Sequence, residues 1–494
     1  MKFFVKARLC TLLGIAGTLL TVPMSNAASD EHNQGVVKAP LALESCFVKG
    51  LDTQIKCGKL TVPENWQSPT HKTIDIHVTV VNAVAATPKP DPLVLLMGGP
   101  GQAGSELVAG LVKIFREANE SRDLVLIDQR GTGLSNPLMC ENKDANPYLD
   151  VQADFKLSDI DQCIASYDAD LAQYGTTTAI ADFEAVREAL GYQQINLYGI
   201  SYGSRAAMVY MREKPESLRS VILDGVVPPQ IPVGPMGSEA ARAFDILIAQ
   251  CSENEACSNR YPTLKDDYHK VRAQLEKQTI ETTIDHPVTD KPITFKLDTA
   301  KFIGTLHSLM YGVGAREIIP FVISQVAIGN YKPIAGIIAA GQGKEDKIYT
   351  GMQLNILCNE DMPRAGQDLI ERSRNNSFSG HHSIDDLVKV CQHWPSFDAP
   401  ANFGDQVKSD LPTLLLSGEL DPVTPPAWAE LALEGLSNHK HYVAKKAGHG
   451  LVTQTCAAKM VAQFIDKGQF EDIDDSCLDK QPLPGFLLNN NGSW

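Results

Sequence analysis

The chain has 494 residues, enough for two domains or for one large, elaborated domain. Hydrophobic residues make up 43% and charged residues 21%, which is the composition of a folded globular protein and excludes a largely disordered chain. The formal net charge of −15 argues against a nucleic-acid partner, because an acidic surface repels phosphate backbones.

Residues 1–27 have the layout of a secretory signal peptide. Lys2, Lys6 and Arg8 give a positive start, residues 9–22 are almost wholly apolar, and residues 25–27 are small. The apolar stretch is short for a membrane span, so an uncleaved anchor is the less favoured alternative. We therefore expect a cleaved chain, periplasmic or extracellular, without membrane attachment.

Strand patterns begin at residue 73. Residues 73–80 alternate between apolar and polar side chains, which predicts a half-exposed strand. Short apolar runs bounded by Gly, Pro or Asp predict central strands of a parallel sheet, and they lie at 93–97, 124–127, 221–223 and 414–416. Apolar residues at helical spacing predict a helix over 178–190. Strand–helix–strand alternation indicates an α/β layer fold.

The sequence pattern changes after residues 228–229. Helical patterns at 239–250 and 264–277 follow, and parallel-strand runs return only at 413. We expect a first part of the sheet domain at 28–230, a mainly helical cap at 231–400, and a C-terminal part of the sheet domain at 401–494.

The strongest local signal is the motif Gly-Ile-Ser-Tyr-Gly at 199–203. It follows a short strand predicted at 195–198 and precedes a helix predicted at 204–213. A tight strand–turn–helix needs small residues on both sides of the serine and exposes its hydroxyl. This context predicts a nucleophile elbow with Ser201 as the nucleophile; the alternative is a glycine-rich turn with an exposed serine.

A serine hydroxyl is a weak nucleophile and needs a base. The chain order serine, acid, histidine is typical of α/β-hydrolases. Asp421 follows the strand predicted at 413–417, and His449 lies between two glycines that let the backbone bend. We predict a catalytic triad of Ser201, Asp421 and His449, with Asp224 as the less favoured acid.

Negative charge developing on a substrate carbonyl oxygen needs fixed N–H donors. We expect one from Tyr202, the residue after the nucleophile, and one from Gly99 in the glycine-rich loop at 98–101. The alternative for this loop is a plain turn. In the loop at 128–135, Asp128 and Arg130 are expected to brace the site. This chemistry needs neither a metal nor an organic cofactor.

Ten of the eleven cysteines follow the predicted cleavage site, an even number for an oxidising compartment. We hypothesise five disulfides between sequence neighbours, although sequence alone does not fix the connectivity. The pairs would be Cys46/Cys57, Cys140/Cys163, Cys251/Cys257, Cys358/Cys391 and Cys456/Cys477. A metal site is the weaker alternative, because the sequence has no Cys-x-x-Cys pair.

The motifs at 98–101, 128–135 and 199–203 resemble those of the proline-iminopeptidase group of α/β-hydrolases, and most of all its secreted tripeptidyl-aminopeptidase-like branch. The likeness extends to 223–227, to the Cys251/Cys257 pair and to 351–361. It implies the α/β-hydrolase fold: a mostly parallel central sheet with helices on both faces, interrupted by a large, mainly helical cap. Iminopeptidases usually carry a histidine where this chain has Met97, so strict prolyl specificity is not implied.

The resemblance also implies removal of residues from a free peptide N-terminus, because relatives hold the α-amino group with acidic residues of the cap. A buried amine favours a carboxylate partner. Glu360 and Asp361 are the candidates in this chain and Glu239 is a lesser one. The alternative for Glu360 and Asp361 is a solvated acidic loop.

The sequence therefore favours a secreted serine aminopeptidase that hydrolyses short peptides through an acyl-enzyme. A carboxylesterase or lipase with the same triad is the main alternative, because the elbow and the oxyanion hole serve esters equally well. A non-catalytic binding protein on the same scaffold is the least favoured reading, since such proteins typically lose a member of the triad. The sequence leaves the oligomeric state open.

Overall fold

The computed structural model describes residues 41–69, 72–140, 146, 148–149, 157–341 and 347–489. All of these described residues belong to one compact unit. The predicted signal peptide at 1–27 lies outside the described residues.

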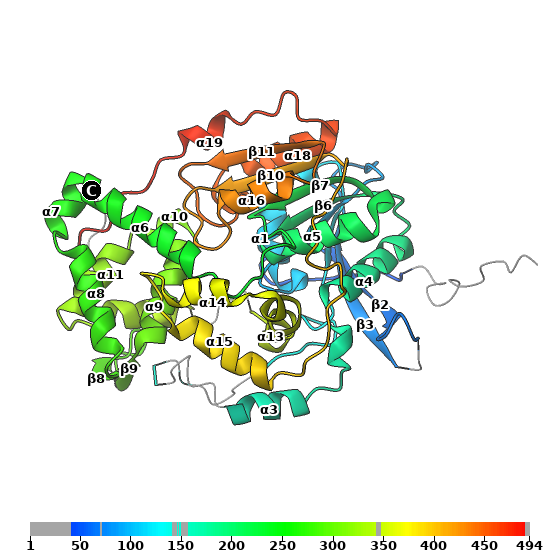
Figure 1. Ribbon diagram of the computed structural model, residues 1–494. Helices are drawn as coiled ribbons and strands as arrows, with labels where there is room; N and C mark the ends of the chain where they lie inside the picture. Colours follow the sequence, from blue (N-terminus) through cyan, green and yellow to red (C-terminus); the bar gives the residue numbers. More distant parts are fainter. Residues whose placement is uncertain are drawn as a thin grey trace, which may run out of the picture. The chain divides into compact units, whose positions relative to one another are not determined.

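Within the described residues, a nine-stranded sheet has the order β1-β2-β3-β5-β4-β6-β7-β10-β11 (Figure 1). Neighbouring strands pair antiparallel from β1 to β5 and parallel from β5 to β11. The strands are β1 (Glu44–Cys46), β2 (Ile55–Pro63), β3 (Thr73–Val81), β4 (Leu93–Leu96), β5 (Leu124–Ile127), β6 (Ile195–Ile200), β7 (Leu218–Asp224), β10 (Thr413–Gly418) and β11 (His439–Ala444). The sheet is mostly parallel, as predicted.

Strand β4 shows how the sequence divides the core into two layers. Successive side chains of a strand point to opposite faces, and all four residues of β4 are buried. Val94 packs into the cluster that contains Phe183 of helix α4 (Thr176–Ala189). Leu95 packs into the cluster that contains Phe464 of helix α18 (Ala457–Lys467). The sheet therefore carries helices on both faces, and the predicted fold class is confirmed.

The helices before and after the cap complete the sheet domain. They are α1 (Gly104–Ile114), α2 (Arg116–Asn119), α3 (Leu157–Ala165), α4 (Thr176–Ala189), α5 (Tyr202–Glu213), α16 (Pro426–Leu433), α17 (Leu451–Gln454), α18 (Ala457–Lys467) and α19 (Ser476–Lys480). The helix predicted at 178–190 is α4, and the one predicted at 204–213 is α5, which begins two residues earlier.

The cap is the chain between β7 and β10, and most of its elements pack around a hydrophobic cluster of their own that includes Phe244, Tyr268 and Phe302. Its helices are α6 (Gly237–Glu253), α7 (Glu255–Arg260), α8 (Leu264–Leu275), α9 (Thr299–Met310), α10 (Val313–Arg316), α11 (Ile319–Ala327), α12 (Lys332–Gly341), α13 (Thr350–Ile356), α14 (Gln367–Arg374) and α15 (His382–His393). A π-helical turn, η3 (Leu357–Asp361), follows α13. The residue boundaries of the predicted domains stay predictions.

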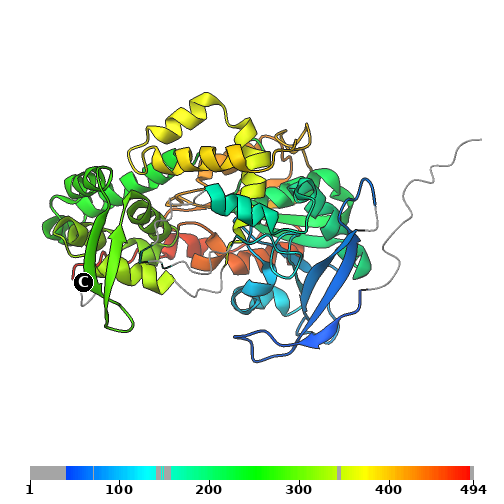
Figure 2. The ribbon, with the colours of Figure 1, turned by 90° about the horizontal axis from the view of Figure 1, so that it is seen from below.

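The cap also contains an antiparallel hairpin of β8 (Ile280–Asp285) and β9 (Pro292–Leu297), which Figure 2 shows among the helices. The sequence did not predict this hairpin. Each strand has only six residues, and the buried side chains are few, such as Ile284 and Phe295. So short an alternation resembles the irregular segments that join helices.

The structure pairs the cysteines as hypothesised. The five disulfides are Cys46–Cys57, Cys140–Cys163, Cys251–Cys257, Cys358–Cys391 and Cys456–Cys477. Disulfides of this number are typical of an oxidising compartment. In the part of the chain that the structure describes, no helix combines the length and the apolar character needed to cross a membrane.

Candidate active site

Ser201 lies in the turn between β6 and α5. Its backbone has φ 57° and ψ −126°, a conformation that costs free energy for a residue with a side chain. A Cβ atom added at Gly199 would collide with the carbonyl of Gly203, and one added at Gly203 would collide with the carbonyl of Leu96. Both glycines of the motif are therefore required by close backbone approach, which explains the spacing of the nucleophile elbow.

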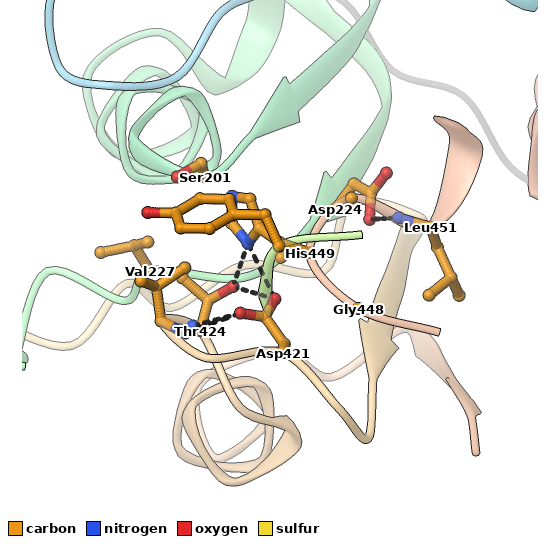
Figure 3. Close-up of polar contacts among 12 residues, drawn as sticks. Ser201, Asp224, Val227, Asp421, Thr424, Gly448, His449 and Leu451 are labelled. Atoms are coloured by element: carbon orange, nitrogen blue, oxygen red, sulfur yellow. Dashed lines mark hydrogen bonds and ion pairs between the residues drawn. The ribbon is translucent and has the colours of Figure 1, made fainter. Parts of the chain in front are cut away.

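Asp421 and His449 follow the ends of β10 and β11 and contact each other. Nδ1 of His449 lies 2.8 Å from Oδ2 of Asp421 (Figure 3). The backbone N–H groups of Val423 and Thr424 donate to Oδ1 of Asp421, each at 2.8 Å, and Oγ1 of Thr424 donates to Oδ2 at 2.7 Å. These bonds fix the carboxylate and its orientation toward the imidazole.

Sequence analysis missed Thr424, although the segment carries a signal for it. An aspartate followed by proline favours a turn, and the aspartate side chain then accepts N–H groups two and three residues on. Asp421-Pro422 followed by Thr424 fits this pattern.

The buried pair favours a charged imidazole. Burial lowers the pKa of His449, but the charge and hydrogen bond of Asp421, together with the charge of Asp224, raise it above its ordinary value. Burial raises the pKa of Asp421, and the interactions with His449 and Thr424 more than offset that rise. The site therefore stabilises a proton on His449 while Asp421 stays ionised, as a general base needs.

The loop of His449 lies against the ends of β6 and β7. A Cβ atom at Gly450 would lie 2.9 Å from Cδ1 of Ile200, the residue before the nucleophile, and one at Gly225, directly after β7, would lie 3.1 Å from Cε1 of His449. Figure 3 draws Ser201 above the imidazole and Asp421 below it. The structure thus brings the three predicted triad residues to one edge of the sheet.

Asp224 lies at the end of β7 and binds both of these loops. Its backbone carbonyl accepts the N–H of Ser201 at 2.9 Å. Its carboxylate accepts the N–H groups of Leu451 at 2.7 Å and Val452 at 3.1 Å, and the hydroxyl of Tyr198 at 2.9 Å. The structure records the hydrogen bond to the imidazole at Asp421 and not at the alternative acid Asp224.

The glycine-rich loop at 98–101 lies against the nucleophile. A Cβ atom at Gly98 would lie 3.0 Å from Cβ of Ser201. The N–H of Gly98 donates to Oε1 of Gln102 at 3.1 Å, and Gly99 adopts φ +104°, which favours glycine. Tyr202 begins α5, so its N–H belongs to the open start of the helix. Tyr202 thus follows the nucleophile and Gly99 follows the residue that contacts it; their role as an oxyanion hole stays a prediction.

Asp128 and Arg130, expected to brace the site, bind neighbouring elements of the sheet domain. Asp128 accepts the N–H and the hydroxyl of Ser105 at 2.8 and 2.7 Å and the N–H of Leu134 at 3.0 Å. Arg130 forms a fully buried ion pair with Asp182 at 2.6 Å. These contacts join the loop after β5 to α1 and to α4.

Glu360 and Asp361, expected to hold a substrate amine, have partners inside the protein. Both oxygens of Glu360 accept from Thr176, one from its N–H and one from its hydroxyl, each at 2.6 Å. The same hydroxyl contacts Oη of Tyr202 at 2.6 Å. Asp361 pairs with Arg205 at 2.6 Å. Substrate binding would require these partners to be exchanged, so the amine-binding role of both residues stays a prediction.

Burial has the largest effect on the pKa of Glu360. It raises the pKa of that carboxyl to about 7, against the lowering effect of the hydrogen bonds from Thr176. Glu360 is 4% exposed, so it does not belong to a solvated acidic loop.

Glu239 lies on α6 of the cap, and its side chain is 22% exposed. Its carboxylate is 3.7 Å from Nε of Arg242. The guanidinium of Arg242 donates to the backbone carbonyls of Glu419 and Asp421. Helix α6 therefore packs against the loop that contains Asp421, and the partly exposed carboxylate of Glu239 lies on the same helix.

A second cap segment reaches the histidine loop. The backbone carbonyl of Tyr311 accepts the N–H of His449 at 2.8 Å, and the two rings meet edge to face with centroids 5.2 Å apart. Gln454 joins both segments: it donates to the carbonyl of His449 at 2.6 Å and accepts the N–H of Val313 at 3.3 Å. No sequence motif marks these contacts. Among the described residues, no group of three or more His, Cys, Asp or Glu is arranged to hold a metal ion.

Two family models match separate parts of the sequence. The model described as "alpha/beta hydrolase fold" matches residues 91–246, and the model described as "TAP-like protein" matches residues 376–477. The chain thus has the α/β-hydrolase fold, and its C-terminal part is similar to TAP-like proteins. The resemblance inferred from the sequence motifs is thereby confirmed.

Three relatives show how far the similarity of the sequence extends. Serine protease Hip1 of Mycobacterium tuberculosis is 30% identical over 223 residues, which are 41% of this chain and 42% of Hip1. Putative hydrolase YuaR of Escherichia coli is 28% identical over 367 residues, 69% of this chain and 71% of YuaR. Tripeptidyl aminopeptidase of Streptomyces lividans is 28% identical over 210 residues, 39% of each chain. The matches thus span about two fifths of the length of the two named peptidases.

Proposed function

We propose that this α/β-hydrolase is a serine aminopeptidase that removes residues from the free N-terminus of short peptides. The observation that carries the proposal is the hydrogen bond between Asp421 and His449, in a loop that packs against the strand of Ser201. The printed names of Hip1 and of the Streptomyces enzyme support a peptidase rather than an ester hydrolase.

In the proposed reaction His449 first accepts a proton from Ser201 and then donates it to the leaving amine. As Oγ of Ser201 bonds to the substrate carbonyl carbon, Nε2 of His449 takes the hydroxyl proton. The N–H groups of Gly99 and Tyr202 stabilise the oxyanion that forms. His449 then gives the proton to the leaving amine, the C–N bond breaks, and an acyl-enzyme remains. A water molecule then attacks the acyl carbon while His449 takes its proton. His449 returns that proton to Oγ of Ser201 as the ester bond breaks, and the carboxylic acid product leaves.

Glu239 is the expected amine-binding acid that agrees best with the structure, because its carboxylate is partly exposed beside the loop of Asp421. A charge-assisted bond to the α-amino group contributes about 1.5–3 kcal/mol, so Glu239→Gln should raise KM for unblocked peptides about tenfold or more. KM for N-blocked peptides should not change. Equal changes for both substrate types would reject this role.

The proposed location is the periplasm or the extracellular space. The predicted signal peptide and the five disulfides support it.

The test combines covalent labelling with a substrate panel. A fluorophosphonate probe should label the purified protein at Ser201 and leave Ser201→Ala unlabelled. Aminoacyl-, prolyl-, dipeptidyl- and tripeptidyl-anilides, each free and N-blocked, should be compared with short-chain esters. Hydrolysis of free anilides, lowered about a thousandfold or more in Ser201→Ala, supports the proposal. Hydrolysis of esters alone would favour a carboxylesterase, and an unlabelled native protein would reject the role of Ser201.

A further inference from the structure

Asp224 is a fully buried carboxylate that the proposed reaction does not use. It is fixed at the end of β7, between the strands β6 and β10. Its neighbour Gly225 donates its N–H to the carbonyl of Leu416 in β10, so the position of Asp224 is determined by the centre of the sheet.

The hydrogen bonds of Asp224 point to one task. Its carbonyl holds the N–H of Ser201, while its carboxylate holds the N–H groups of Leu451 and Val452, the second and third residues after His449. One residue thus sets the distance between the loop of the nucleophile and the loop of the base. Figure 3 shows the bond to Leu451 on the side of His449 away from Thr424.

We propose that Asp224 is a positioning residue: a second buried carboxylate that holds His449 in line with Ser201 from the side opposite Asp421. The proposal rests on the proposed function insofar as His449 acts as the base. It differs from the role of the triad acid, because Asp421 contacts the imidazole directly and Asp224 acts through the backbone that follows it.

The charge of Asp224 also reaches the imidazole. It raises the pKa of His449, after the larger effect of Asp421. Burial raises the pKa of Asp224 itself, and the bonds from Leu451, Val452 and Tyr198 act against that rise.

The other titratable groups around His449 belong to the cap. They are His307, whose pKa burial lowers to about 4, and Tyr311, whose pKa burial raises. Neither adds a negative charge near neutral pH. Removal of the charge at Asp224 should therefore move the titration of His449 downward.

The decisive variant is Asp224→Asn, which keeps the size of the side chain and removes its charge. In protein with 15N-labelled histidine, the imidazole of His449, assigned with His449→Gln, should titrate at a lower pH than in the native protein. The acid limb of fluorophosphonate labelling should shift in the same direction. The kcat should fall about tenfold to a hundredfold with little change in KM, because a small displacement of the base slows proton transfer without weakening binding.

Glu184→Gln is the matched control. Glu184 is a buried carboxylate of α4 that is bonded to Arg187, Tyr210 and Ser217. Its loss should lower stability while the titration of His449 and the kcat per folded molecule stay native.

The outcomes separate the two proposals. The positioning role is overturned if Asp224→Asn leaves both the titration of His449 and kcat unchanged, or if Glu184→Gln reproduces its effects. If the native protein hydrolyses nothing and resists the probe, the proposed function fails while the imidazole titration still decides the role of Asp224. Should Asp224→Asn not fold, Tyr198→Phe removes one bond to the same carboxylate. Its labelling rate should fall about threefold, and a native rate would overturn the proposal.

Discussion

The sheet and the cap hold the candidate active site in different ways. On the sheet side, Ser201, Asp224, Asp421 and His449 follow the ends of adjacent strands, and hydrogen bonds join them to one another. Parallel strands place their carboxyl ends at the same edge, so the positions of these residues follow from the order of the strands.

On the cap side the polar contacts are not joined to one another, and they reach the backbone of the site loops or a side chain of α5. Arg242 donates to the carbonyl of Asp421, Tyr311 accepts from the N–H of His449, and Asp361 pairs with Arg205 of α5. None of them involves a side-chain atom that takes part in the proposed proton transfer. The difference indicates that the sheet aligns the reacting groups, whereas the cap supports loops that are already aligned.

Two buried arginines test this difference most strongly. Arg130 pairs with Asp182 inside the sheet domain, and Arg130→Met leaves that carboxylate buried without its ion pair, which should lower the free energy of unfolding by about 3–5 kcal/mol. Arg205 joins the sheet domain to the cap, but Arg364 lies 3.4 Å from the same oxygen of Asp361. Arg205→Met should therefore cost less, about 2 kcal/mol. Guanidinium unfolding measures the free energy of unfolding of both variants. Equal losses would mean that the ion pair between the cap and the sheet domain stabilises the fold as much as the one inside the sheet domain.

The disulfides of the cap allow a comparison within that region. Cys358–Cys391 closes a loop with a sequence separation of 33, and Cys251–Cys257 one of 6. A longer closed loop restricts the unfolded chain more, so the paired Cys→Ser variants should lose about 4 and about 2 kcal/mol respectively. Denaturant unfolding of the native protein and of the two variants, each with its remaining disulfides intact, measures which variant loses more free energy of unfolding. A reversed order would show that native contacts near Cys251, rather than chain entropy, dominate.

Glu360 tests how tightly the cap closes over the sheet domain. Its pKa of about 7 in the folded protein lies above that of an exposed glutamate, so between about pH 4 and pH 8 the unfolded chain releases a proton that the folded chain retains. The free energy of unfolding should consequently fall by about 3 kcal/mol over this range as the pH rises. Glu360→Gln, which mimics the protonated form, should lack this contribution. Identical pH profiles would show that water reaches the carboxyl.

The sequence predicted those features that neighbouring residues decide. The elbow around Ser201 follows from two glycines and a strand–turn–helix, and β4 and β5 follow from short apolar runs. Asp421 and His449 could be chosen because chain order and strand ends restrict the candidates.

Features that depend on distant contacts were beyond the sequence. Asp224 and Leu451 are 227 residues apart, and they meet only because β7 and β10 are neighbours in the sheet. Likewise, the sequence left Glu360 between an amine-binding acid and a solvated acidic loop, because its hydrogen-bond partner, Thr176 of α4, is 184 residues away. The hairpin β8–β9 was missed because its strands are short and only partly buried.

Gln454 offers the smallest and most local test of the comparison. It accepts the N–H of Val313 and donates to the carbonyl of His449, so it links the cap to the histidine loop. Gln454→Leu should lower the free energy of unfolding by only about 1–2 kcal/mol, because uncharged hydrogen bonds contribute about 1 kcal/mol each.

Hydrogen exchange should locate this effect at residues 311–316 and 448–454. The matched control is Gln325→Leu, which removes a bond to Asn330 within the cap and should leave exchange at His449 native. If Gln454→Leu also leaves the exchange of the histidine loop native, the loop does not depend on Gln454, and its supports are Asp224 in the sheet domain and the carbonyl of Tyr311 in the cap.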